Sequence, residues 1–472
     1  MSLKSRIQSY SNKDSNPILK PDGSITIGNV HSEPPPILPL TFDLLTDKDM
    51  EYKEKIHQKL MEILDLSLIV KMADANAKKQ ISEIARRIID EESIPIIARV
   101  RQLIVNEVVN DILGFGPLEH LLYEPSIADI LVNGYNSVYV ERFGILEKTP
   151  ITFKDNAHLL KVIDRIVTQV GRRIDEYSPL VDARLKDGSR VNAIIPPLAI
   201  DGPSLSIRRF TQDKMQLQDM VNIGTLSQAM ADVFANMVKV RLNILISGGT
   251  GSGKTTMLNA LSNNIPINER VVTIEDSAEL QLKIDNLVRL ETRPANIEGK
   301  GEITQRDLVK NSLRMRPDRI VIGEVRGQEA FDMLQAMNTG HDGSLTTVHA
   351  NTARDALSRI ENMVSMSGFD LPVKAIRSQI ASAINVVLQL ERMEDGRRRV
   401  ISVCEINSME GDIITMSEIF KYERRGLDDH GNIIGRYIST GIVPRFHERM
   451  KQRGFNMDLD VYIDQTNRSL KD

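Results

Sequence analysis

The spacing of hydrophobic residues changes several times along the chain. Residues 1–46 are polar and contain the proline-rich run EPPPILP, so they offer few side chains for a core. We expect a disordered N-terminal arm over 1–46, which is either a solvated tail or a docking segment. Apolar residues then recur with helical spacing in the stretches 47–69, 78–92 and 94–114. Three consecutive amphipathic helices predict a helical bundle over 47–123. In its first helix, five residues are expected to share the buried face: Met50, Ile56, Leu60, Ile63 and Leu64.

The next part of the chain mixes two periods. Residues 129–153 alternate between apolar and polar positions around Asn-Gly, which is typical of hairpins. The stretch 158–174 has helical spacing, and 189–198 and 204–210 read as strands. These features predict an α+β domain over 124–217.

From residue 218 to residue 472, short β-branched runs alternate with helical stretches. The runs LNILIS, RVVTIED, RIVIGEV and SLTTVH are candidate strands, and NVVLQL is a possible fifth. Buried parallel strands read as continuous apolar runs of this kind. Their alternation with helices predicts an α/β domain with a doubly wound, mainly parallel sheet.

Composition and charge narrow the classes of function. The chain of 472 residues is 41% hydrophobic and 26% charged, and 60 basic residues against 64 acidic ones give a net charge of -4. This balance gives no reason to expect direct binding of nucleic acid. Cys404 is the only cysteine, which excludes an intrachain disulfide or a four-cysteine zinc site, and its apolar surroundings predict a buried core position. No apolar h-region opens the chain and no run approaches about 20 apolar residues, so we expect no signal peptide and no transmembrane segment. A cytoplasmic location is therefore expected.

The clearest functional motif in the chain is a glycine-rich loop. GGTGSGKTT follows the strand-like run LNILIS, precedes a helical stretch and satisfies the pattern G-x-x-x-x-G-K-[ST]. Such a loop turns backbone N–H groups toward phosphate oxygens, its lysine reaches the β- and γ-phosphates, and its hydroxyl residue binds Mg²⁺. We expect ATP to bind here, with Thr255 contacting Mg²⁺. The expected contact residues are Gly248, Gly249, Thr250, Gly251, Ser252, Gly253, Lys254, Thr255 and Thr256.

Acidic residues end two of the other predicted strands. Glu275 and Asp276 end RVVTIED, and Glu324 lies near the end of RIVIGEV. The carboxyl ends of parallel strands line the ligand crevice of such a sheet. Glu324 is a candidate Mg²⁺ ligand, acting directly or through water, and Glu275 is the candidate general base. The alternative is that these groups merely cap a strand or helix.

Basic and imidazole groups complete the candidate site. His349 ends the strand SLTTVH, where it is either a γ-phosphate sensor or a structural residue. Four arginines lie upstream of the loop, where guanidinium groups are either surface residues or partners of the γ-phosphate. They are Arg184, Arg190, Arg208 and Arg209.

Taken together, these motifs resemble a known family. GGTGSGKTT, TIEDSAELQL, RMRPDRIVIGEVRG and NTGHDGSLTTVHANT stand in the order of the Walker A, Asp box, Walker B and His box motifs of type II/IV secretion ATPases. Within that superfamily, DARLKDGSRVNAIIPPLAIDGPSLSIRRF resembles the CpaF-type motors of tight-adherence (Tad) pili. VirB11-like conjugation ATPases and archaeal pilus motors are close relatives. The single cysteine argues against extension motors that carry a tetracysteine zinc element.

The resemblance implies both an architecture and an activity. It implies a PAS-like domain followed by a RecA-like domain, assembled as a homo-hexamer that hydrolyses ATP with Mg²⁺. It also implies docking onto inner-membrane platform proteins of a pilus or secretion system. In this family Lys254 and Thr255 would bind phosphate and Mg²⁺, Glu275 would activate water, and Glu324 would orient the Mg²⁺ shell. His349 and the four arginines would contact the γ-phosphate side, and Glu279 could exchange roles with Glu275.

Two other classes of function fit parts of the sequence. A nucleic-acid translocase also uses a P-loop ring, but the net charge and the 4% aromatic content do not favour it. A small-molecule kinase would leave the arginines and the predicted bundle unexplained. A motor that drives pilus assembly, either alone or together with retraction, accounts for most of the features.

Overall fold

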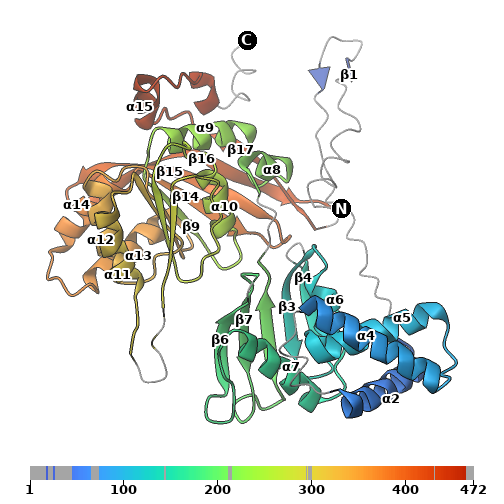
Figure 1. Ribbon diagram of the computed structural model, residues 1–472. Coiled ribbons are helices and arrows are strands. Elements are labelled where there is room, and N and C mark those ends of the chain that lie inside the picture. Colours follow the sequence, from blue (N-terminus) through green and yellow to red (C-terminus); the bar gives the residue numbers. More distant parts are fainter. Residues whose placement is uncertain are drawn as a thin grey trace. The chain divides into compact units, whose positions relative to one another are not determined.

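The computed structural model describes residues 18–19, 25–26, 45–64, 74–142, 145–185, 187–210, 215–293, 295, 300–429 and 431–463. The chain forms two compact units, Met1–Asp213 and Lys214–Asp472 (Figure 1). At its start, β1 (Ile18–Leu19) pairs antiparallel with β2 (Ile25–Thr26). Most of the predicted arm lies outside the described residues.

Three helices of the first unit pack around one apolar core: α2 (Asp47–Ile63), α4 (Asp74–Glu91) and α5 (Ala98–Leu113). Ile56 and Leu60 of α2 are fully buried, as predicted, but Met50 and Ile63 are 46% and 52% exposed, so their predicted burial is wrong. The third buried position of α2 is Lys53, whose ammonium pairs with Glu107 and Asp111 of α5. Lys53 can be buried on this face because two carboxylates pair with its charge.

The rest of the first unit is an antiparallel sheet covered by a helix. A 3₁₀ turn (Gly116–Leu118) and α6 (Glu119–Leu122) lead into six strands in the order β5-β4-β3-β8-β7-β6. Their bounds are β3 (Ile127–Asn133), β4 (Val138–Arg142), β5 (Ile145–Lys148), β6 (Leu180–Arg184), β7 (Arg190–Ile194) and β8 (Ser204–Arg208). The helix α7 (Asn156–Gln169) begins at an Asp155 cap and buries its apolar stripe against the sheet.

The second unit is built on a nine-stranded sheet in the order β11-β10-β12-β13-β9-β14-β15-β16-β17. Its first six strands in that order are parallel. They are β11 (Leu287–Glu291), β10 (Val271–Glu275), β12 (Arg319–Ile322), β13 (Leu345–Val348), β9 (Ile244–Gly248) and β14 (Val386–Arg392). Three long antiparallel strands then extend the sheet: β15 (Arg398–Glu410), β16 (Ile413–Leu427) and β17 (Ile433–Ser439). The predicted α/β class is confirmed, and the sheet is mixed.

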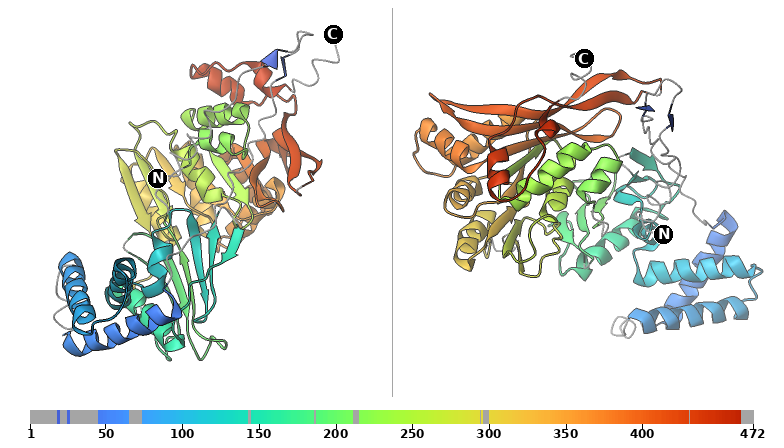
Figure 2. Two further views of the ribbon diagram at one scale, coloured as in Figure 1. Left: turned by 90° about the vertical axis from the view of Figure 1, so that its right-hand side faces the viewer. Right: turned by 90° about the horizontal axis from the view of Figure 1, so that it is seen from above.

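Helices cover both faces of this sheet, as the two views in Figure 2 show. The strand β9 sends Ile244 and Ile246 into one core and Leu245 into the other. The first core includes α8 (Leu217–Asn222), α9 (Gln228–Lys239), α10 (Lys254–Ser262) and α15 (Phe446–Gln452). The second includes α12 (Glu329–Asn338), α13 (Ala353–Ser365) and α14 (Val373–Ala383), and α11 (Gln305–Ser312) adds Val309.

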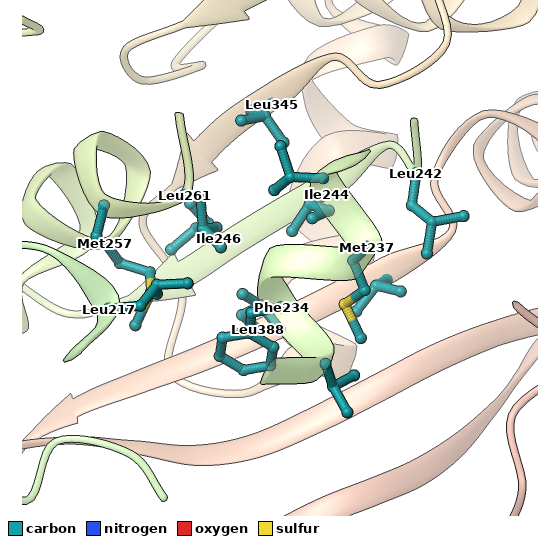
Figure 3. Close-up of a cluster of buried hydrophobic side chains, with 14 of the residues drawn as sticks. Leu217, Phe234, Met237, Leu242, Ile244, Ile246, Met257, Leu261, Leu345 and Leu388 are labelled. Atoms are coloured by element: carbon teal, nitrogen blue, oxygen red, sulfur yellow. The ribbon is translucent and has the colours of Figure 1, made fainter. Parts of the chain in front are cut away.

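The packing around β9 fixes the strand that leads into the glycine-rich loop. Phe234 and Met237 of α9 and Leu261 of α10 gather on one face of β9, beside Ile244 and Ile246 (Figure 3). All five side chains are fully buried. The loop between β9 and α10 is therefore held at both ends by close-packed elements.

Two single features complete the fold. Cys404, on β15, is 7% exposed, which confirms its predicted core position. Across the described ranges, none of the helices has the length and hydropathy needed to cross a bilayer.

Candidate functional site

The glycine-rich loop has the backbone geometry of a phosphate cradle. Gly251 and Gly253 have φ angles of +71° and +93°, which favour glycine. Gly248 is required for a different reason, because a Cβ there would lie 2.7 Å from the carbonyl oxygen of Leu390. The loop ends at the N-terminus of α10, where unpaired N–H groups and the helix dipole favour an anion.

Lys254 is the first residue of α10, and its ammonium group points back over the loop. Its Nζ donates to the carbonyl oxygens of Gly248 and Gly249, at 3.0 Å each. Burial lowers the pKa of Lys254, while the nearby charge of Glu324 acts in the opposite direction. The lysine therefore lies within electrostatic reach of the carboxylate of Glu324, which follows β12.

Four parallel strands bring the candidate residues to one edge of the sheet. The strands β10, β12, β13 and β9 are consecutive neighbours in the sheet, and each ends at or just before a candidate group. Glu275 ends β10, Glu324 follows β12, His349 follows β13, and the cradle follows β9. The structure thus places Glu275, Glu324 and His349 at the same edge of the sheet as the loop, where ligand-binding residues of a parallel sheet are expected.

Glu275 is the most strongly perturbed acid at this edge. It is 2% exposed, and its Oε1 accepts hydrogen bonds from the backbone N–H groups of Glu279 and Leu280, at 2.8 Å each. Its Oε2 is buried with no hydrogen-bond partner among the described atoms. Burial raises the pKa of Glu275 to about 7, although the two backbone donors act in the opposite direction. Such a carboxylate is suited to accept a proton near neutral pH.

The neighbouring strand leaves room for this carboxylate. A Cβ added to Gly323 would lie 3.1 Å from the Cγ of Glu275. Any larger side chain at Gly323 would press on Glu275, so the buried position of Glu275 depends on a glycine at residue 323.

Glu324 has a partner that the sequence pattern did not predict. Arg326 donates from Nε and Nη2 to the Oε2 of Glu324, at 3.0 and 2.6 Å. Its Nη1 donates to the Oδ2 of Asp276, at 3.2 Å. One guanidinium group therefore bridges the acidic residues that follow β12 and β10.

His349 lies between the cradle and the end of β12. It is half-buried and directly follows Val348, whose register partner on β9 is Ser247. Its strand is tied to the next one by Thr347, whose hydroxyl donates to the carbonyl oxygen of Gly323 at 2.7 Å. This placement suits a group that senses a ligand held in the loop.

Three of the four predicted arginines form a row in the first unit. Arg184 is the register partner of Arg190, which is the partner of Arg208, so their side chains share one face of the sheet. Arg208 also pairs with Asp129, at 3.1 Å. Like charges placed directly opposite one another are unfavourable, which makes the row a candidate anion-binding surface.

Arg209 points to the other side of the chain. Its Nη1 donates to the carbonyl oxygens of Glu124 and Ile127, the latter at 3.0 Å. These contacts fasten the end of β8 to the start of β3.

Two further arginines lie against the loop and were missed by sequence reasoning. Arg398 donates from Nε to the carbonyl oxygen of Gly251 at 2.8 Å, and a Cβ added to Gly251 would lie 3.4 Å from Nη1 of Arg392. The two arginines are register partners on β14 and β15. The basic run GRRR at 396–399 was the available signal, but only the pairing of these strands brings it to the loop.

The residues present fit Mg²⁺ with a nucleotide and do not form a metal site alone. Among the described residues, no group of three or more His, Cys, Asp or Glu side chains could hold a metal ion. Mg²⁺ binds such sites through one or two protein oxygens together with phosphates and water. The hydroxyl of Thr255, in the first turn of α10, and the carboxylate of Glu324 provide that number of ligands.

Comparison with known proteins decides the family. The model of the type II/IV secretion system protein family matches residues 111–433, which span the sheet of the first unit and the whole loop edge of the second. The chain belongs to this family. The resemblance seen in the four motifs is confirmed at this level.

Individual relatives come from secretion and conjugation systems. A Mycobacterium tuberculosis protein provisionally named a conjugal transfer protein is 39% identical over 309 residues, which cover 64% of this chain and 87% of the relative. The type IV secretion system protein VirB11 of Bartonella quintana is 31% identical over 326 residues, covering 61% of this chain and 90% of VirB11. Among solved structures, the VirB11 ATPase of the Brucella suis type IV secretion system, in complex with sulphate, is 27% identical with a TM-score of 0.34. That match covers 61% of this chain and 95% of the solved one.

Proposed function

We propose that this protein is an Mg²⁺-dependent ATPase that acts as a hexameric motor of a pilus or secretion system. The observation that supports it best is the edge formed by β10, β12, β13 and β9, where a phosphate cradle meets a buried glutamate, a second carboxylate and a histidine. These groups match the roles that ATP hydrolysis requires. The membership of a secretion-system family supports the motor role.

In the proposed reaction, Glu275 is the general base. Its Oε2 takes a proton from water as the water oxygen bonds to the γ-phosphorus, and the bond to the β–γ bridging oxygen breaks. Lys254 offers positive charge to the β- and γ-phosphates. Bound Mg²⁺ supplies further charge neutralisation, with Thr255 and Glu324 holding it.

The remaining residues would contact the γ-phosphate when it is present and lose that contact after hydrolysis. His349 lies at the edge where that group is expected, and the row formed by Arg184, Arg190 and Arg208 would approach from a first unit of the same chain or of a neighbouring chain. Arg209 would support the row by fixing its strand. Closure and release of the first units during turnover would move a platform protein of the inner membrane, to which the ring docks from the cytoplasm.

Assembly of Tad-type pili is the specific role that we favour. The segment 182–210 carries the resemblance to that class, and helices precede the sheet of the first unit. Type IV secretion or conjugal DNA transfer is the second candidate, favoured by the names of the relatives that match 61–64% of the chain.

Replacing Lys254 by alanine tests the proposal. The variant should lose ATP turnover in the purified protein and pilus formation in the native host, because the β- and γ-phosphates lose their cationic partner. Normal piliation with loss of DNA transfer or protein secretion would instead select the second candidate. Normal turnover in the variant, or a monomer in light scattering with ATP present, would contradict the motor proposal.

A further inference from the structure

Arg326 is placed to control access to the two carboxylates at the carboxyl ends of β10 and β12. Its guanidinium contacts Glu324 with two nitrogens and Asp276 with the third. Glu324 is the residue proposed to hold Mg²⁺, so arginine and metal would compete for one carboxylate. The inference therefore rests on the proposed function of this edge.

The backbone of Arg326 is fixed while its side chain is not buried. The N–H groups of Arg326 and Gly327 donate to Oε1 of Glu329, at 2.7 and 2.8 Å, and Val325 before them is 1% exposed. The side chains of Arg326, Asp276 and Glu324 are 58%, 40% and 23% exposed. The guanidinium can turn away from the carboxylates with no change in the turn that carries it.

The charge of Arg326 determines how strongly Asp276 and Glu324 attract a metal ion. With Arg326 in place, the three side chains carry a net charge of -1, and without it two neighbouring carboxylates carry -2. A divalent cation is attracted much less by the first arrangement. A nucleotide changes this balance, since its phosphates offer the guanidinium other anionic partners.

We propose that Arg326 is a built-in counter-ion that excludes free divalent cations from Asp276 and Glu324. The metal then enters only together with the nucleotide, when the guanidinium leaves Glu324. This ordering keeps the acidic pair from being occupied by a bare cation between turnovers.

The proposal is tested by titrating the full chain with Mn²⁺ in the absence of nucleotide. Electron paramagnetic resonance of the free ion measures how much Mn²⁺ is bound. The variant R326Q should bind Mn²⁺ about tenfold more tightly than the wild type, since removal of a partly exposed charge strengthens the attraction modestly. The double variant R326Q/E324Q should lose that gain. R326K, which keeps the charge but cannot contact both carboxylates with the same geometry, should lie between R326Q and the wild type.

A matched control is available in the same unit. Arg377 contacts Glu361 through two nitrogens, at 2.8 and 3.2 Å, away from the loop edge. R377Q should leave Mn²⁺ binding unchanged. Equal or weaker Mn²⁺ binding by R326Q with a wild-type melting temperature would overturn the proposal.

A second measurement separates this inference from the proposed function. The Mg²⁺ concentration that half-saturates binding of a fluorescent ADP should be lower for R326Q than for the wild type. If the wild type binds no nucleotide, or binds it equally well after K254A, the proposed function fails. If nucleotide binding requires Lys254 but its Mg²⁺ dependence is the same in R326Q, the counter-ion proposal alone fails.

Discussion

At the scale of the residue, burial gives Glu275 its unusual properties. Its carboxyl group is buried at the carboxyl end of β10, and only one of its two oxygens accepts hydrogen bonds from backbone donors. Protonation of this residue should therefore affect both hydrolysis and stability in the neutral range.

We predict that ATP turnover rises with pH through about 7, because the base must be ionised to accept a proton. The variant E275Q should lose turnover at every pH while it still binds nucleotide. The control is E279Q, because Glu279 is half-buried and lies in the segment that follows β10. Full loss in E279Q with activity kept in E275Q would assign the base to Glu279 instead.

The same group should destabilise the folded protein at high pH. In the unfolded chain Glu275 ionises near pH 4.5, and in the folded chain near pH 7. Its contribution to stability is therefore complete below about pH 4.5 and is lost as pH rises through 7. At 1.36 kcal/mol per pKa unit, this difference amounts to roughly 3 kcal/mol. Urea unfolding of E275Q should show greater stability than the wild type at pH 8 and a much smaller difference at pH 5.

Gly323 should control the position of Glu275. In G323A the new Cβ would lie 3.1 Å from Cγ of Glu275, whose carboxylate is held by two N–H groups and has little freedom to move. We expect kcat to fall about tenfold through a small misplacement of the base, with ADP affinity unchanged. Gly426→Ala is the control, since nothing lies within 4 Å of its added Cβ. Wild-type kcat in G323A would show that the base tolerates the shift.

At the scale of the element, one buried ion pair fastens the sheet at the end opposite the loop. Arg319 begins β12 and is fully buried, and its Nη2 donates to Glu269 at 3.0 Å. Its Nη1 donates to the carbonyl oxygen of Val238, at 2.7 Å, just before the C-terminal end of α9. The pair thus joins β12, α9 and the turn that precedes β10.

Removing one partner of this pair should be costly. R319A should lower the free energy of unfolding by about 3 kcal/mol, because the buried Glu269 would keep only Arg241 as an ionic partner, at 3.3 Å, and the carbonyl oxygen of Val238 would lose its donor. The double variant R319M/E269L should lose less than R319A, as measured by urea unfolding. R377A, at a partly exposed pair, should change stability by about 1 kcal/mol or less. A similar small change in R319A would mean that Arg241 or water satisfies Glu269.

At the scale of the whole molecule, the arginine row and the phosphate cradle belong to different units. Arg190 stands in the middle of the row, between Arg184 and Arg208. The motor proposal requires this row to meet the γ-phosphate in the assembled ring. ADP lacks the γ-phosphate, so its affinity should not depend on the arginine row.

We therefore predict that R190A lowers kcat at least about a hundredfold, as arginines at a γ-phosphate commonly do, while ADP affinity stays the same. Steady-state hydrolysis and titration with fluorescent ADP measure the two effects. R173A, at an exposed arginine of the same unit paired with Asp175, should change neither. Equal loss of ATP and ADP binding in R190A would place the row at the other phosphates or outside the site.

Much of this protein follows from local sequence. The apolar runs of β9, β10, β12 and β13, the phosphate loop and the carboxylates after the strands are contiguous patterns, so their chemistry could be predicted residue by residue. The α/β class follows from the alternation of these runs with helices. The long strands β15, β16 and β17 were missed because their long, partly exposed runs lack the short, continuous apolar pattern that marked the others.

Only the tertiary structure decided how distant groups meet. Strand order brings Gly323 against Glu275, Arg326 to Asp276, and Arg398 to Gly251. The members of each pair are far apart in the sequence, and hydrophobic periodicity does not predict that they meet. Register aligns Arg184, Arg190 and Arg208, and ion pairs with α5 allow Lys53 to be buried, which the hydrophobic pattern did not predict. The physical reason is that a motif fixes the local conformation, whereas pKa values, ion pairs and close contacts depend on what neighbouring elements bring to the same place.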